Sequence, residues 1–118
     1  MDTISQELTD ALQKRILILD GAMGTTIRGY EHTEEDARGE RFKDAPKDLL
    51  NNGDILSITQ PKTIGDIHKR FLEAGSDIIE TNTFSGTSIA QSEFFVEDPR
   101  ENGNGRKDPE FFEREVAQ

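Results

Sequence analysis

The chain has 118 residues, 32% of them hydrophobic and 32% charged, and a formal net charge of −10 at pH 7. This length suits one modest domain, and the low hydrophobic share predicts a thin or incomplete core. The acidic excess argues against nucleic acid or an anionic membrane surface as a partner, because both attract Lys and Arg. Without cysteine, the chain has no disulfide and no thiolate metal ligand of its own. It also lacks an apolar run of the roughly 18 residues that span a membrane and lacks a signal peptide, so we expect a cytoplasmic protein.

Residues 3–14 predict an amphipathic helix, because apolar side chains recur on one stripe. Four aliphatic residues follow at 16–19 and predict a strand buried on both faces, as in a parallel sheet covered by helices. The strand ends at Asp20. Gly21 and Gly24 are expected to let the next turn bend sharply.

Charged side chains dominate residues 26–52, among few apolar ones. We expect a solvated excursion here, with a helical turn near 34–38. Two interpretations are open, a lid over the end of the first strand and a surface insertion, and the statistics of long loops favour the insertion. A turn at 51–54 and a short extended piece at 55–58 are expected next.

Residues 61–74 predict the best-defined helix of the chain. Pro61 stands at the first helical position, apolar residues recur at helical spacing, and Gly75 is placed for a C-terminal cap. A second short strand is predicted at 77–80 and ends at Glu80. Strand, helix and strand then make a right-handed βαβ unit.

Both predicted strands end in an acid, and neighbouring parallel strands present their carboxyl ends at one edge of a sheet. We therefore expect Asp20 and Glu80 to lie side by side. Their carboxylates would bind the ammonium group of an amino acid, and the amides of the first turn its carboxylate. The predicted substrate-binding residues, none with a catalytic role, are Asp20, Gly21, Ala22, Met23, Gly24, Thr25, Glu80, Thr81, Asn82 and Thr83.

Other interpretations of the two acids stay open. Asp20 could simply cap the turn that it precedes. The pair could instead serve in general acid–base catalysis, or hold Mg²⁺ together with a substrate phosphate.

The two histidines are not spaced as metal ligands. His68 falls on the apolar stripe of the helix at 61–74 and is expected to be packed and hydrogen-bonded. His32 lies in the charged segment and is expected to be exposed.

Four stretches of the sequence together resemble the homocysteine-binding module of the cobalamin-dependent methionine synthases. They are DGAMGT at 20–25, RGERF at 38–42, NNGDILSITQP at 51–61 and AGSDIIETNTF at 74–84. The resemblance covers about residues 10–93. The wider group of homocysteine methyltransferases shares the strand ending in Asp-Gly, whereas RGERF and the Asn-Asn motif are particular to the cobalamin enzymes.

The resemblance implies an α/β fold, namely the first two βα units of a (β/α)₈ TIM-type barrel. That barrel would be incomplete here, since it needs roughly 250 residues. In the family, homocysteine binds at the carboxyl ends of the strands, and three cysteines of later strands hold a zinc ion that makes its thiol a thiolate. The thiolate attacks the methyl group of methylcobalamin, which comes originally from 5-methyltetrahydrofolate. Zinc and cobalamin are thus implied for the full-length enzyme, and neither is expected on this chain alone.

The expected partners are homocysteine, the missing barrel strands and the cobalamin and folate modules. We divide the chain into part of the homocysteine-binding barrel at 1–93 and a divergent, linker-like stretch at 94–118 that ends in a short helix. Ala22 stands where many relatives have glycine, and its methyl group costs little if its φ is negative.

We expect the isolated chain to be marginally stable and inactive, because units that would cover its apolar surfaces are missing. Two other functions stay open. One is a non-catalytic binding or regulatory fragment. The other is a phosphohydrolase of the haloacid dehalogenase kind, whose Asp-x-Asp-Gly-Thr motif would need an acid in place of Ala22.

Overall fold

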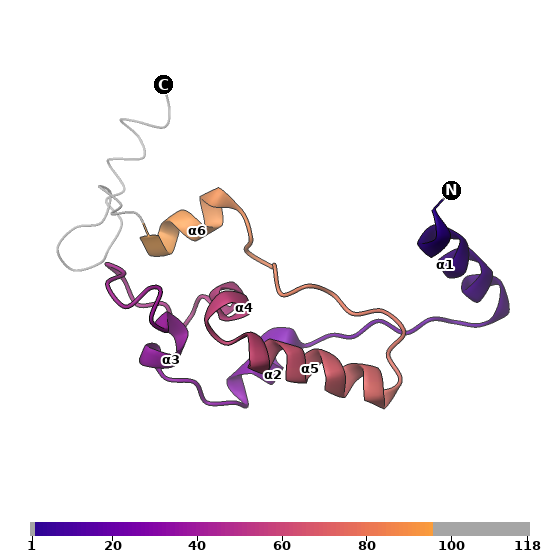
Figure 1. Ribbon diagram of the computed structural model, residues 1–118, viewed down its shortest axis with the longest axis horizontal. Helices are drawn as coiled ribbons and strands as arrows, with labels where there is room; N and C mark the ends of the chain where they lie inside the picture. Colours follow the sequence, from indigo (N-terminus) through magenta and orange to yellow (C-terminus); the bar gives the residue numbers. More distant parts are fainter. Residues whose placement is uncertain (1, 96–118) are drawn as a thin grey trace, which may run out of the picture.

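A computed structural model describes residues 2–95 of the chain (Figure 1). Its helices are α1 (Thr3–Lys14), α2 (Met23–Arg28), α3 (Glu34–Arg38), the 3₁₀ helix η1 (Gly53–Ile55), α4 (Leu56–Thr59), α5 (Pro61–Ala74) and α6 (Ser88–Phe95). Helices α2 to α5 gather in one group, and α1 stands apart from them at the end of an extended segment. None of the helices within residues 2–95 has the length and apolar character to cross a bilayer.

Helix α1 has the predicted bounds and begins with a capped N-terminus. The Asp2 carboxylate accepts a hydrogen bond of 2.7 Å from the Ser5 N–H. No residue of α1 is buried, and the side chains of Ile4 and Leu12 on its apolar stripe are exposed. In the described part of the chain, this helix therefore covers no core.

The two predicted strands appear as extended segments that run parallel and meet at a single bridge, between Leu19 and Ile78. The Asp20 N–H donates to the Ile78 carbonyl at 3.0 Å, and the Ile78 N–H donates to the Ile18 carbonyl at 3.2 Å. Within residues 2–95 no longer strand forms. Ile18 and Leu19 are 58% and 54% exposed, so the expected burial on both faces is wrong. The physical reason is that, within the described residues, each segment pairs with only one neighbour.

Asp77 anchors the second segment to the first. Its carboxylate accepts both terminal N–H groups of Arg15, at 2.6 and 2.9 Å, and the N–H of Ile18 at 2.9 Å. The Arg15 guanidinium and the Ile18 amide lower the pKa of Asp77 to about 2. The parallel pairing thus depends on an ionised Asp77.

We expect acid to weaken this pairing. The pKa of Asp77 is lower in the folded than in the unfolded chain, so its stabilising effect is complete above about pH 4 and is lost as the pH falls toward 2. Thermal unfolding followed by circular dichroism should show the melting temperature falling over this range, and Asp77→Asn should lower it at pH 7 and flatten the fall. An equal fall in Asp77→Asn would contradict this role.

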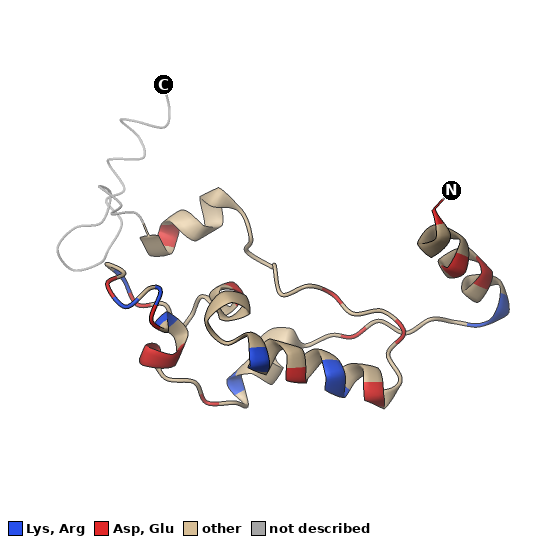
Figure 2. Ribbon diagram, viewed as in Figure 1, with Lys and Arg blue, Asp and Glu red and all other residues tan. Residues whose placement is uncertain are grey.

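Helix α5 crosses between the two extended segments, as predicted, with Pro61 in its first turn. Its C-cap is Gly75, whose φ of 114° lies in the left-handed region that favours glycine. Thr63, Ile64 and Ile67 form its buried face. On its visible side, basic and acidic residues alternate along the helix (Figure 2).

The charged segment at 26–52 has the helical turn predicted near 34–38, which is α3. It is not a solvated excursion, however, and that prediction is wrong. Its residues Ala37 and Leu49 are fully buried and form the core together with Leu56 of α4 and Ile64 of α5. The partly buried side chains packed against this core are Met23, Ile27, Phe42, Ala45, Phe94 and Phe95. The segment therefore supplies half of the buried core cluster.

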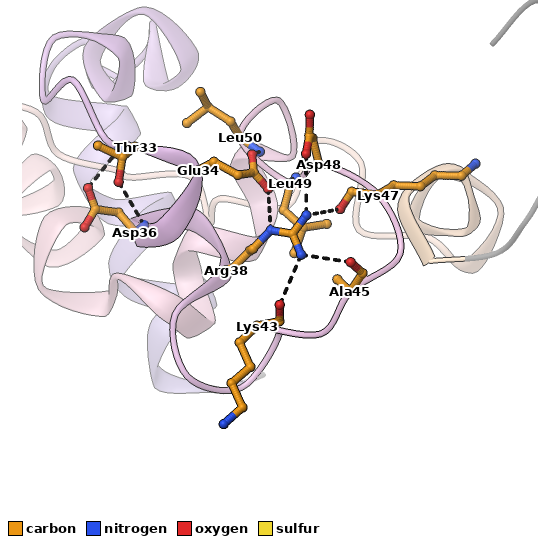
Figure 3. Close-up of polar contacts among 10 residues, drawn as sticks. All are labelled: Thr33, Glu34, Asp36, Arg38, Lys43, Ala45, Lys47, Asp48, Leu49 and Leu50. Atoms are coloured by element: carbon orange, nitrogen blue, oxygen red, sulfur yellow. Dashed lines mark hydrogen bonds and ion pairs between the residues drawn. The ribbon is translucent and has the colours of Figure 1, made fainter. Parts of the chain in front are cut away.

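Arg38 organises this segment through its planar guanidinium (Figure 3). Its acceptors are Glu34 Oε1 (2.8 Å), the carbonyl oxygens of Lys43 (3.2 Å), Ala45 (2.8 Å) and Lys47 (3.0 Å), and Asp48 Oδ1 (3.5 Å). Glu34 in turn accepts the N–H groups of Leu49 and Leu50, at 2.6 and 2.8 Å. Burial raises the pKa of Glu34, but these amides and Arg38 together bring it below its usual range.

The predicted extended piece at 55–58 is also wrong, because this stretch is helical in η1 and α4. A run of four residues is too short for its apolar pattern to separate strand from helix. Ser85, Gly86 and Thr87 also indicate the start of a helix that runs to about Phe94, and the structure has α6 there. The linker-like stretch predicted at 94–118, with its closing helix, lies outside the described residues from residue 96 onward.

Candidate active site at the ends of the two extended segments

A cavity of about 1010 Å³ opens where the two extended segments end. Nine of the ten predicted site residues line it, namely Asp20, Gly21, Ala22, Met23, Gly24, Glu80, Thr81, Asn82 and Thr83. The tenth, Thr25, instead borders a second hollow with Tyr30 and Arg70. The parallel register thus brings both acids to one cavity.

Asp20 and Glu80 are joined directly. The Glu80 N–H donates to Asp20 Oδ1 at 3.1 Å, and the Glu80 carbonyl accepts a hydrogen bond of 3.0 Å from His68 Nε2. The Asp20 carboxylate therefore links the first extended segment to the second. His68 is hydrogen-bonded, as its position on α5 predicts. These contacts fix the Glu80 backbone on both sides.

The side-chain oxygens that remain are available to a ligand. Within residues 2–95, Asp20 Oδ2 and the Glu80 carboxylate have no hydrogen-bond or ion-pair partner, and both residues line the cavity. Two carboxylates at one opening attract a cation, because each strengthens the field of the other.

The turn after Asp20 bends at Ala22, whose φ of 50° and ψ of 33° are left-handed. Neither Gly21 nor Gly24 has a positive φ, and a Cβ on either would meet no atom within 4 Å in the described chain. The turn thus does not depend on these two glycines, contrary to the prediction. The condition set for Ala22, a negative φ, is not met, and its methyl group costs roughly 1–2 kcal/mol.

Asn82 is 8% exposed, and its side chain is already occupied. Its Nδ2 donates to the Gly53 carbonyl at 2.8 Å and to Ser57 Oγ at 3.1 Å. On either side of it, the hydroxyl groups of Thr81 and Thr83 are hydrogen-bonded to each other at 2.8 Å.

The cavity has a second wall that sequence reasoning missed. It is formed by residues of the charged segment and the turn after it, among them Arg28, Glu31, His32, Asn51 and Asp54. In the sequence, the turn signal at 51–54 is the one feature that marks part of this wall. The charges of the remaining segment predict exposure to solvent.

His32 is not exposed as predicted. Its side chain is 14% exposed, its Nε2 lies 3.1 Å from Thr63 Oγ1, and its ring stacks on that of Tyr30 with 6.2 Å between centroids. Packing of the segment against α5 buries this side chain, which the local charge pattern does not reveal.

The zinc ion implied by the resemblance does not fit the residues of this chain. The sequence has no cysteine, and residues 2–95 contain no group of three or more His, Cys, Asp or Glu side chains placed to hold a metal.

A model of the family described as homocysteine S-methyltransferase matches residues 17–106, well over half of the chain. The chain belongs to the homocysteine S-methyltransferase family. The match begins within the first extended segment and includes both acids and every residue that lines the cavity. In this homocysteine S-methyltransferase domain, the cavity at the segment ends is therefore the candidate active site.

Proposed function

We propose that this cavity binds homocysteine as the methyl acceptor of a methyltransferase, and that the paired acids Asp20 and Glu80 recognise its ammonium group. The observation that supports this most directly is the hydrogen bond from the Glu80 N–H to Asp20 Oδ1, which holds both acids at one opening. An ammonium group between two carboxylates gains charge-assisted hydrogen bonds. Family membership favours this function over a phosphohydrolase.

The residues of this chain would bind and orient the substrate. The carboxylates hold the ammonium group, and the amides of the turn at 21–25 face the substrate carboxylate, which leaves the thiol at the free end of the side chain. A thiol must lose its proton to become a strong nucleophile. By resemblance, the methyl donor is methylcobalamin, the enzyme is a methionine synthase, and zinc and cobalamin belong to parts of it outside the described residues.

We further propose that the described residues form the first two βα units of a (β/α)₈ barrel. Two parallel segments joined through α5, with Ile18 and Leu19 exposed beside their single bridge, are the arrangement expected where further strands and helices would pack. The chain by itself would then bind substrate weakly and be inactive.

The proposal is tested by titrating the 118-residue chain with L-homocysteine and following backbone amide signals by NMR. We expect weak binding that shifts the signals of residues 21–25 and 81–83. Glu80→Gln should raise the Kd about tenfold, which corresponds to about 1.4 kcal/mol, the loss of one charge-assisted contact. The matched control is Glu7→Gln, an exposed carboxylate on α1, which should leave the Kd unchanged.

A second ligand separates recognition of the ammonium group from other contacts. 4-Mercaptobutanoate is homocysteine without its amino group, so it should bind more weakly and be insensitive to Glu80→Gln. Equal binding of both compounds would contradict the role of the acids. Binding of Mg²⁺ with a phosphate analogue, and not of homocysteine, would support the phosphohydrolase, and binding of neither would support a non-catalytic fragment.

A further inference from the structure

The side-chain amide of Asn82 has no donor capacity left for a ligand. An amide nitrogen has two hydrogens, and those of Asn82 Nδ2 are directed to the Gly53 carbonyl and to Ser57 Oγ, at 2.8 and 3.1 Å. Ser57 Oγ also lies 3.4 Å from the Asn82 carbonyl oxygen. Breaking these contacts to bind a substrate would leave the half-buried Gly53 carbonyl without this donor.

The chain after Asn82 is held at a second point by η1, the helix that contains Gly53. Asp54 Oδ2 accepts the Ser85 N–H at 2.7 Å, and Gln91 Nε2 donates to the Ser85 carbonyl at 2.9 Å. Gln91 and the buried Asn52 also exchange hydrogen bonds between their amide groups, at 2.8 and 3.2 Å. Residues 82 and 85 are thus both fixed to residues 52–57, which include η1 and the start of α4.

Between these two points lie Thr83 and Phe84, which line the cavity. Phe84 is fully exposed, so its own packing does not determine where it lies. Its place, and that of Thr83, follows from the contacts at Asn82 and Ser85. The Asn-Asn-Gly-Asp motif at 51–54 therefore helps to position the cavity wall through these hydrogen bonds. Its residue Asn52 does so without lining the cavity.

We infer that Asn82 is a positioning residue, which holds residues 81–85 of the cavity wall against residues 52–57 and does not contact the substrate. This inference rests on the homocysteine site proposed above, and it assigns two different roles to residues of that site. The acids recognise the ligand, and the buried amide sets the shape of the wall beside them.

The test uses Ser57→Ala, because Ser57 contacts Asn82 but does not line the cavity. Affinity for L-homocysteine is measured at a temperature where all variants are folded, so that lower stability alone does not change it. We expect Ser57→Ala to raise the Kd about threefold and Asn82→Ala about tenfold, and the double variant to be no weaker than Asn82→Ala. If Ser57→Ala binds like the wild type while Asn82→Ala loses affinity, Asn82 contacts the substrate directly and the inference is overturned.

Ser92→Ala is the matched control, since it removes a serine hydroxyl whose 2.7 Å hydrogen bond goes to Ile89 within α6. It should leave the Kd unchanged. Hydrogen exchange of the Ser85 amide gives a readout that needs no ligand, and it should be faster in Ser57→Ala and Asn82→Ala but not in Ser92→Ala. If the wild type does not bind homocysteine, the proposed function fails, and this exchange rate alone decides the inference: unchanged exchange overturns it, and faster exchange supports it.

Discussion

Leu49→Ala is expected to lower the free energy of unfolding by about 2–4 kcal/mol, the largest effect of any substitution considered for this chain. Leu49 is fully buried and packs in the core with Ala37, Leu56 and Ile64. Removing three of its carbon atoms loses their burial and leaves a cavity that the surrounding helices fill only in part. Urea unfolding followed by circular dichroism measures this loss, with sucrose present so that both proteins start folded.

Leu50→Ala is a control with the same chemistry one residue further along the chain. Leu50 is 47% exposed, and its substitution should cost less than about 1 kcal/mol. If both variants lost equal stability, or neither did, the segment would be the surface insertion that its composition indicates. A difference of 2 kcal/mol or more would establish it as part of the core.

Arg38→Met is expected to lower the free energy of unfolding by about 2 kcal/mol. The substitution keeps most of the apolar stem but removes the donors to the carbonyl groups of Lys43, Ala45 and Lys47, and it leaves Glu34 without its cation. The Arg38 side chain is only 20% exposed, so water replaces these partners incompletely. The same urea unfolding measurement applies.

Two further variants separate charge from geometry. Arg41→Met removes an exposed guanidinium, 5.5 Å above the ring of Phe42, and should cost about 0.5 kcal/mol. Arg38→Lys keeps the charge but not the planar set of five donors, so it should recover less than half of the loss. Full recovery by lysine would show that charge alone matters at this position, and a loss no larger than that of Arg41→Met would contradict the organising role of Arg38.

The helices of this protein that could be predicted are those whose signals are local. Helix α5 begins at Pro61 and is capped by Gly75, and these residues act within one turn of the helix ends. The segment around Arg38 gave one local signal, the helical turn near 34–38 that is found as α3. The carbonyl acceptors of the Arg38 guanidinium, in contrast, lie five to nine residues away at no helical or strand spacing. The charged residues of this segment therefore predicted exposure to solvent. In the structure, Glu34 and Arg38 instead hold the backbone around the buried Leu49.

The candidate site also has one part that the sequence predicts and one part that depends on packing. That both extended segments end in an acid is visible in the sequence, and the structure places these acids at one cavity. The second wall, which contains His32 and Asp54, could not be predicted, because it depends on how the charged segment packs against α5. That the cavity binds homocysteine stays a prediction.

By itself, the sequence determined the two main helices, the acid at the end of each extended segment and the family to which the chain belongs. These features depend on residues close together in the chain, whose spacing is enough to specify them. Only the tertiary structure decided that the left-handed residue of the turn is Ala22, and that Asn82 bonds to Gly53 and Ser57. The physical reason is that hydrogen bonds between residues 25 to 60 positions apart form only when packing brings their segments together, and local propensities do not encode that placement.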